Sequence, residues 1–209
     1  MKKATLKTKI KDLGKYLTSD AAQDALAVLE RELKVWEEPK AEQNTAKDFL
    51  PPKELAGSVN ALALFSDGGC RGNPGPGAYA YMLQNAKGEV LAEFSEVAAF
   101  TTNNKMELSG VIQGLKFAAT EYGVGTKIFV YTDSKYVVDG IKSWVAGWKK
   151  RGWKKADKKE PENLDFWKEL DQLNLKMDLE FHWVKGHAGH PQNERVDELA
   201  NLAMDANGY

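Results

Sequence analysis

The sequence predicts an α/β domain that follows a small, all-helical extension. Short apolar runs that end at glycines, such as residues 61–69, are typical of buried strands. Segments with apolar residues at helical spacing alternate with these runs from residue 61 onward, whereas residues 1–37 show helical spacing only. Two of the expected strands end at Asp67 and Asp133, which are the kind of positions where open α/β sheets bind ligands.

Composition limits the class of protein. The chain has 209 residues and is 43% hydrophobic, which suits one domain with an appendage or two small domains. No apolar run approaches the roughly 20 residues needed to span a bilayer, and the N-terminus has no apolar secretory segment. Cys70 is the single cysteine and cannot form an internal disulfide. We therefore expect a cytoplasmic monomer without membrane contact.

Residues 1–37 are predicted to form two helices. Leu6, Ile10, Leu13 and Leu17 recur at helical spacing, and a second apolar stripe ends at Trp36. Six lysines make the first helix basic, so this extension is a candidate contact surface for a protein or for nucleic acid. A hairpin with a solvated lysine face is the interpretation that we favour.

Residues 38–60 contain three prolines and no clear period, which predicts a linker. The domain at residues 61–209 then begins with an expected hairpin, whose turn lies near residues 85–88. The elements expected in this domain are strands at 61–67, 77–84 and 89–97, a helix at 101–121, a strand at 127–132, helices at 134–140 and 163–173, a strand at 178–184, a loop at 186–191 and a helix at 192–207.

Four carboxylates are candidates for a shared site. Asp67 and Asp133 end strands, Glu107 lies in the first turn of the helix that follows, and Asp197 lies on the last helix. Each alone has a structural explanation: a turn for Asp67, an N-cap for Asp133, a capping box with Asn104 for Glu107 and a solvated helix position for Asp197. If the two strands are parallel neighbours, carboxylates converge there without Lys or Arg partners, which favours a hard cation such as Mg²⁺ or Mn²⁺.

Five separated motifs resemble, in order, those of type 1 ribonuclease H, and especially the bacterial enzymes with a basic protrusion. The motifs are DGGC at 67–70 with GNPGPG at 72–77, TTNNKMEL at 101–108, TDS at 132–134, VKGHAGHP at 184–191 and NERVDELA at 193–200. The resemblance covers residues 61–207. It implies a ribonuclease H-like five-stranded mixed sheet flanked by helices, preceded here by the helical extension.

The resemblance also implies an activity. It predicts an endonuclease that hydrolyses the RNA strand of RNA/DNA hybrids and leaves 5′-phosphate and 3′-hydroxyl ends. Asp67, Glu107, Asp133 and Asp197 are then the catalytic carboxylates that bind two Mg²⁺ ions with substrate, with Mn²⁺ as a substitute. Two such ions about 3.5–4 Å apart can stabilise the attacking and leaving oxygens of a phosphoryl displacement.

His187 is the candidate for proton transfer. It lies between two glycines, Gly186 and Gly189, and imidazole titrates near neutral pH. The resemblance gives it an assisting role in catalysis or product release. A zinc site made of His182, His187 and His190 is the alternative, which we disfavour because these residues lack a typical ligand spacing.

The segment at residues 142–159 has eight Lys or Arg residues and one acid, Asp157. Basic residues attract phosphates with an affinity that falls as salt rises. The spacing of Trp144 and Trp148 predicts that these two side chains pack their helix down and do not stack on nucleotides, while Trp153 remains open to stacking. The resemblance makes this segment a protrusion that grips the DNA strand, with candidate contacts at Lys149, Lys150, Arg151, Trp153, Lys154 and Lys155.

Other substrate contacts follow from the resemblance alone. It places Cys70, Asn73, Asn104 and Glu107 along the minor groove, where 2′-hydroxyls distinguish RNA. It also places a DNA phosphate near Thr102 and Asn163. Simple turn chemistry for Asn73 and helix capping for Asn163 are the alternatives.

Lys135 departs from the family pattern, because many bacterial relatives have a base-contacting glutamine there. We therefore expect Lys135 to contact a phosphate. Two other functions remain open on sequence alone: a related nuclease that acts on DNA, and a hybrid-binding protein that does not cleave. The four intact carboxylates favour cleavage over binding alone.

Overall fold

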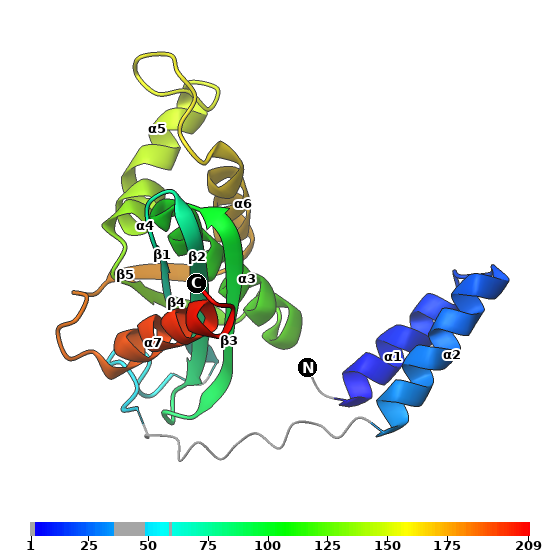
Figure 1. Ribbon diagram of the computed structural model, residues 1–209. Coiled ribbons are helices and arrows are strands. Elements are labelled where there is room, and N and C mark those ends of the chain that lie inside the picture. The colour runs from blue at the N-terminus through cyan, green and yellow to red at the C-terminus, as the bar shows by residue number, and fades with distance from the viewer. Residues whose placement is uncertain (1–2, 36–48, 59) are drawn as a thin grey trace. The chain divides into compact units, whose positions relative to one another are not determined.

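The computed structural model describes residues 3–35, 49–58 and 60–209 (Figure 1). The chain divides into two compact units, residues 1–47 and residues 48–209. Within the described residues, no helix combines the length and apolar character that crossing a membrane requires.

The first unit is a helical hairpin, as predicted. Helix α1 spans Lys3–Gly14 and helix α2 spans Asp20–Val35. Ser19 starts the second helix, since its Oγ accepts a hydrogen bond of 3.4 Å from the backbone N–H of Ala22. The buried contacts between the helices come from Ile10, Leu26 and Leu33. The predicted stripe also included Trp36, which lies outside the described residues.

The second unit contains a five-stranded mixed sheet, which confirms the predicted fold class. Its strand order is β3-β2-β1-β4-β5. Strand β1 is antiparallel to β2 and parallel to β4, so the strand that contains Asp67 and the strand that precedes Asp133 are parallel neighbours. The strands are β1 (Ala61–Cys70), β2 (Gly75–Asn85), β3 (Val90–Thr101), β4 (Lys127–Thr132) and β5 (Leu179–Trp183).

Helices cover both faces of this sheet because successive residues of a strand point to opposite sides. Leu62 and Leu64 of β1 pack in a core with α3 and α6, whereas Ala63 and Phe65 pack in a second core with α7. The helices are α3 (Asn103–Tyr122), α4 (Lys135–Asp139), a π-helix η1 (Gly140–Trp144), α5 (Val145–Lys150), α6 (Leu164–Lys176) and α7 (Pro191–Ala206).

Strand β1 is longer than the sequence predicted. Its parallel pairing with β4 ends at Phe65 opposite Tyr131, but its antiparallel pairing with β2 continues to Cys70 opposite Gly77. Asp67 therefore lies within the strand and not in a turn, immediately beyond the parallel pairing. The side chain is thereby held on rigid backbone.

The caps of two helices also differ from the expected ones. Thr102 is the N-cap of α3 and accepts a hydrogen bond from the N–H of Lys105, so Glu107 lies in the second turn and forms no capping box with Asn104. Ser134 is the N-cap of α4, accepting from the N–H of Val137, so the carboxylate of Asp133 is left for other contacts.

Residues 49–58, which we call the strap, are integrated into the second unit. Gln84 Nε2 donates to the carbonyls of Phe49 (2.6 Å) and Gly88 (2.9 Å), and Gln192 Nε2 donates to the carbonyl of Leu50 (2.9 Å). Leu55 is fully buried in the core beneath α7. The sequence predicted a linker through residue 60, but its described part is packed against the domain. Residues 38–48 of that expected linker lie outside the described residues.

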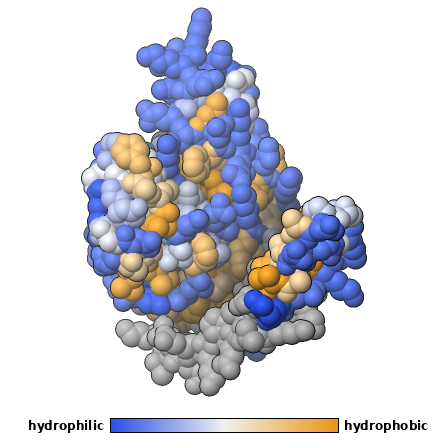
Figure 2. Space-filling model, turned by 45° about the vertical axis from the view of Figure 1, so that its right-hand side comes forward, coloured by the Kyte–Doolittle hydropathy of each residue, from blue (hydrophilic) through white to orange (hydrophobic). Residues whose placement is uncertain are grey.

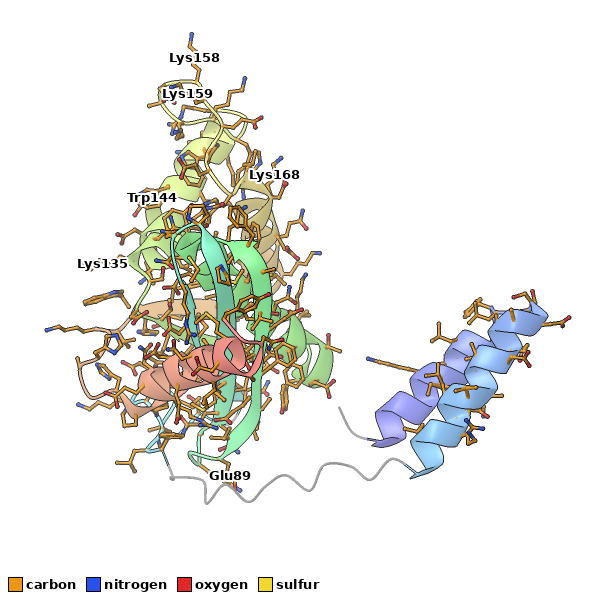
Figure 3. The ribbon with its side chains drawn as sticks, viewed as in Figure 1. Glu89, Lys135, Trp144, Lys158, Lys159 and Lys168 are labelled. Atoms are coloured by element: carbon orange, nitrogen blue, oxygen red, sulfur yellow. The ribbon has the colours of Figure 1, made fainter. Side chains whose placement is uncertain are left out.

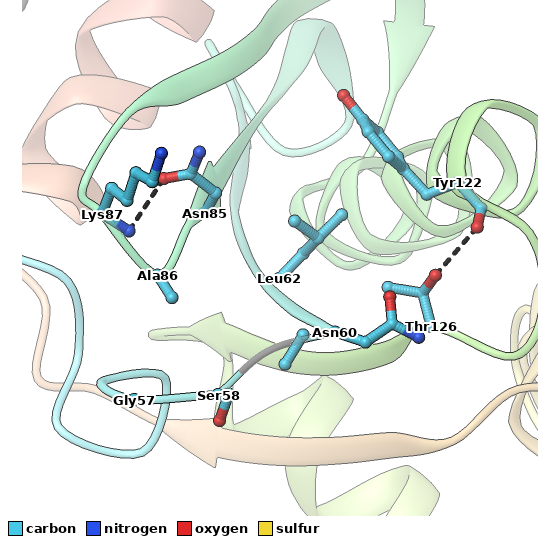
Figure 4. A pocket seen from close by; sticks show the side chains of 10 residues that line it. Gly57, Ser58, Asn60, Leu62, Asn85, Ala86, Lys87, Tyr122 and Thr126 are labelled. Atoms are coloured by element: carbon cyan, nitrogen blue, oxygen red, sulfur yellow. Dashed lines mark hydrogen bonds between the residues drawn. The ribbon is translucent and has the colours of Figure 1, made fainter.

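A pocket opens where the strap meets the start of β1 (Figure 4). Asn60, Leu62, Asn85 and Tyr122 are among its lining residues, and Thr126 Oγ1 donates a hydrogen bond to the carbonyl of Tyr122. None of the four candidate carboxylates lines this pocket, because they lie toward the other end of β1.

Candidate active site

The structure brings three of the four candidate carboxylates together. One oxygen from each of Asp67, Glu107 and Asp133 lies within 4.8 Å of the others. Asp67 comes from β1, Glu107 from α3, and Asp133 follows the last residue of β4. The parallel pairing of β1 with β4 places the two aspartates at the same edge of the sheet, as predicted.

Two glycines allow this close approach. A Cβ on Gly68 would lie 2.3 Å from the carbonyl carbon of Met106 and 2.5 Å from the backbone nitrogen of Glu107. The start of α3 can therefore contact β1 only where no side chain intervenes. Similarly, a Cβ on Gly186 would lie 2.4 Å from Asp133 Oδ2. The sequence gives both glycines as parts of motifs but does not indicate these contacts.

Asp133 is held by two side chains that the sequence did not identify as site residues. Asn193 is 3% exposed, and its Nδ2 donates to Asp133 Oδ2 at 3.2 Å. Trp183 Nε1 donates to the backbone carbonyl of Asp133 at 2.9 Å. Asn193 lies within a quoted motif, but only the fold brings it next to a residue 60 positions earlier.

The carboxylate cluster is electrostatically unfavourable without a cation. Burial raises the pKa of Asp67 to about 7, and the nearby charge of Asp133 adds to this effect. The pKa of Glu107 is raised well above its ordinary value, first by burial and then by Asp67 and Asp133. Within residues 49–58 and 60–209, no lysine or arginine forms an ion pair with any of the three.

The donor set fits a hard divalent cation. All available ligand atoms are oxygens, which Mg²⁺ and Mn²⁺ prefer. Glu107 Oε2 is buried and has no hydrogen-bond partner, although buried polar atoms are nearly always paired. A cation between the carboxylates would satisfy this oxygen and offset the repulsion among the three charges.

Asp197 and His187 lie beside this cluster. Asp197 is close enough to contribute to the raised pKa of Asp67, but it is not among the three whose oxygens lie within 4.8 Å. His187 Nδ1 is 4.0 Å from Asp197 Oδ2, and its side chain is 83% exposed. His187 also has a backbone φ of 50°, in the left-handed region.

The zinc alternative gains no support. Among the residues that the structure describes, Asp67, Glu107 and Asp133 form the only group of three or more potential metal ligands. His182 instead stacks on Tyr131, with ring centroids 4.9 Å apart, which is the structural role expected from its place in β5.

The predicted groove residues form a connected surface between β1 and α3. The backbone N–H of Cys70 donates to Asn103 Oδ1 at 2.8 Å, and the N–H of Asn103 donates to Asn73 Oδ1 at 3.3 Å. Thr102 caps the helix, and Asn104 is half-buried in its first turn. Asn103 was not among the predicted site residues, yet it links Cys70, at the end of β1, to Asn73 in the bend that follows.

In the basic segment, residues 142–159, the tryptophans pack against the domain and the lysines at the far end are exposed. Trp148 is buried, as predicted. The centroid of its ring lies 6.0 Å from that of Trp144 and 5.7 Å from that of Trp167. Trp153 is half-buried against the same core. Lys158 and Lys159 point outward from the tip (Figure 3).

Not every basic side chain in this segment is free to bind a phosphate group of the substrate. Lys149 Nζ lies 2.8 Å from Asp171 Oδ2, and Asp171 is only 7% exposed. Arg151 Nε donates to the carbonyl of Lys154 at 3.1 Å. By contrast, Lys150 and Lys154 are exposed and Lys155 is half-buried.

The two remaining predicted contact residues are Lys135, at the start of α4, and Asn163, just before α6. Lys135 is exposed, with its Nζ 4.8 Å above the ring of Trp183. Asn163 precedes α6 in a left-handed conformation, but its side chain does not cap that helix. Its Nδ2 donates instead to the hydroxyl of Tyr136 at 3.1 Å.

Comparison with known proteins gives a consistent result. The family model for RNase H matches residues 59–205. Ribonuclease H of Erythrobacter litoralis is 49% identical over 147 residues, which cover 70% of this chain and 98% of that protein.

Solved structures agree with this match. The crystal structure of LC9-RNase H1, a type 1 RNase H with the type 2 active-site motif, aligns with a TM-score of 0.63 at 34% identity, over 71% of this chain and 74% of that one. LC11-RNase H1 in complex with an RNA/DNA hybrid aligns with a TM-score of 0.55 at 26% identity, over 70% of this chain and 98% of that one.

Proposed function

Because this chain belongs to the ribonuclease H family, whose members cleave the RNA strand of RNA/DNA hybrids, we propose that Asp67, Glu107, Asp133 and Asp197 bind the divalent cations for that reaction. The chain is a hydrolase and an endonuclease of this family. The observation that best supports the metal site is the buried, unpaired Oε2 of Glu107 within a cluster of three carboxylates. Mg²⁺ is the proposed cation, with two ions when substrate is bound and Mn²⁺ as a substitute.

The chain's own residues then have separate tasks. Asp67 supplies an oxygen from strand β1 and Asp133 supplies one from the position just after β4, and Asn193 fixes the orientation of Asp133 through a hydrogen bond of 3.2 Å. Cations bound there would activate a water molecule and neutralise the leaving 3′ oxygen. His187 is exposed beside Asp197, which suits proton exchange with the leaving group.

Substrate contacts are proposed along two surfaces. Cys70, Asn73, Asn104 and Glu107 lie where β1 meets α3 and would contact the minor groove of the hybrid, and Thr102, the N-cap of α3, would contact a DNA phosphate. The basic segment would hold the DNA strand with Lys150, Lys154, Lys155 and the lysines at its tip, and Lys135 and Asn163 would contact backbone phosphates nearby. Lys149 is assigned a structural part, because it pairs with the buried Asp171. We also propose that the catalytic domain includes the strap and that the enzyme acts in the cytoplasm.

The decisive experiment is cleavage of a strand-labelled RNA/DNA hybrid in Mg²⁺. We expect cuts in the RNA strand only, with 5′-phosphate products, and complete loss of cutting after chelation. Single-stranded RNA, duplex RNA and duplex DNA serve as controls. Equal cleavage of duplex DNA would support the related DNA nuclease, and hybrid binding without products in either metal would support a protein that binds without cleaving.

Neutralising three exposed lysines of the basic segment, in a Lys150→Gln, Lys154→Gln and Lys158→Gln variant, should weaken hybrid binding and flatten its salt dependence. If each lysine contacts one phosphate, the slope of log Kd against log salt falls by about 2 to 3. Fluorescence anisotropy at several salt concentrations measures the slope. A variant with Lys53→Gln, Lys87→Gln and Lys176→Gln carries the same charge change at other exposed sites and should keep the original slope. Equal slopes of log Kd against log salt in both variants would contradict the role of the basic segment in binding phosphates.

A further inference from the structure

Among the side chains of the helical hairpin that the structure describes, more of the large apolar ones are exposed than buried. The buried core among these described side chains is formed by Ile10, Leu26 and Leu33, each 7% exposed. Apolar residues are visible on the surface of this hairpin in Figure 2. The large ones among the described residues are between 38% and 81% exposed, and they are Leu13, Tyr16, Leu17, Val28 and Leu29.

The exposed residues of α2 form a continuous stripe. Ala21, Ala25 and Val28 are exposed and follow one another at intervals of four and three, so they share a face of the helix. Leu29 is 49% exposed and lies three residues after Leu26, which is buried against α1. The exposed stripe, residues 21, 25, 28 and 29, therefore adjoins the buried contact.

The hairpin is too small to be stabilised by its own core alone. Helices α1 and α2 have 12 and 16 residues, and isolated helices of this length are marginal in water. Units below about 40 residues usually need a disulfide, a metal or oligomerisation to fold. The hairpin contains no cysteine, so a second apolar surface over the exposed stripe is the simplest source of stability.

The charges of the two helices indicate which molecule supplies the apolar surface that covers the exposed stripe. Residues 3–15 contain five lysines and one acid, Asp12, whereas residues 20–35 contain four acids and two bases. A patch with one basic and one acidic helix is complementary to itself: when the apolar stripes of two α2 helices meet across a two-fold axis, the basic α1 of each copy lies beside the acidic α2 of the other. Nucleic acid would be attracted by α1 but repelled by the adjoining α2.

We propose that the exposed stripe of α2 binds the same stripe of a second copy, so that two hairpins form a four-helix bundle. This inference goes beyond the nuclease activity and replaces the expectation of a monomer. Two catalytic units joined through one bundle would then contact the same hybrid, or two hybrids, with increased avidity.

Sedimentation equilibrium of the full chain tests this proposal. The expected mass is about 46 kDa, twice the 23.2 kDa of one chain. A Val28→Gln and Leu29→Gln variant keeps good helix formers and leaves the hairpin core intact, and it should raise the dimer Kd about 100-fold. Leu175→Gln with Leu202→Gln removes two exposed leucines from helices of the second unit, 70% and 52% exposed, and should leave the Kd unchanged.

A charge-swap experiment identifies the partner as a second copy. One variant carries Lys9→Glu, Lys11→Glu and Lys15→Glu, and the other carries Asp20→Lys, Asp24→Lys and Glu30→Lys. The homodimer of each variant alone should dissociate more readily than the dimer of the original chain. A mixture of the two variants should form heterodimers. Circular dichroism verifies that the helices persist, and the glutamine variant provides the test if a swapped chain unfolds. A monomer at every concentration would overturn the proposal, whether the hairpin then binds nucleic acid or its own catalytic unit.

Discussion

Asp133→Asn is expected to lower turnover of an RNA/DNA hybrid by about 10³-fold or more while the Kd for the hybrid changes little. The substitution keeps the shape of the side chain but removes one of the three charges that would hold cations in the cluster. Binding should persist because the basic segment and the groove are unchanged. Single-turnover cleavage measures the chemical step, and anisotropy with a labelled hybrid measures binding.

Asp139→Asn is the matched control for this experiment. Asp139 is an exposed carboxylate of α4, six residues after Asp133, and its side chain makes no capping hydrogen bond. We expect this variant to cleave at the original rate. Full turnover by Asp133→Asn, or equal losses in both variants, would argue against the proposed metal site.

Leu55→Ala should lower the free energy of unfolding by about 2–5 kcal/mol, the usual range for removing a fully buried leucine side chain. Leu55 belongs to the strap and is 0% exposed. Urea denaturation of the full chain measures the change, with an unchanged m-value indicating that the unfolded surface is the same.

Leu50→Ala provides the comparison within the same strap, because Leu50 is 85% exposed. Its expected cost is within about 0.5 kcal/mol. A chain that begins at residue 59, where the family match starts, would lack the whole strap and should be less stable than one that begins at residue 49. Equal stability of the two truncated chains would mean that the strap is dispensable to the domain.

The elements with strong apolar patterns were predictable from sequence, and those held by tertiary contacts were not. Buried β1 and β4 are apolar on both faces, so their runs identified the strands that place Asp67 and Asp133. The Gly68-Gly69 pair suggested a turn, but pairing with β2 extends the strand beyond it. The strap has prolines and no period, and its hydrogen bonds use backbone carbonyls that carry no sequence signal.

The candidate site shows the same division. Asp67 and Asp133 were found from their positions at the ends of expected strands, and the motif series identified all four carboxylates. The sequence did not indicate that Asn193 would orient Asp133, because this contact joins residues 60 positions apart. Nor could a count of basic residues distinguish Lys149, which is paired with buried Asp171, from its exposed neighbour Lys150. Both distinctions depend on which elements the fold brings together.

Gly68 and Gly186 define two different ways in which this chain can lose its activity by mutation. A methyl group at position 68 meets the main chain of Met106, which cannot rotate away, so the damage falls on folding and the protein itself would be depleted. The three atoms nearest to a methyl group at position 186 all belong to the side chain of Asp133, which can swing aside and lose its bond to Asn193. The resulting protein would be abundant and inactive, and it would still occupy hybrids. Such an allele would be dominant over an intact copy, whereas the allele at position 68 would be recessive.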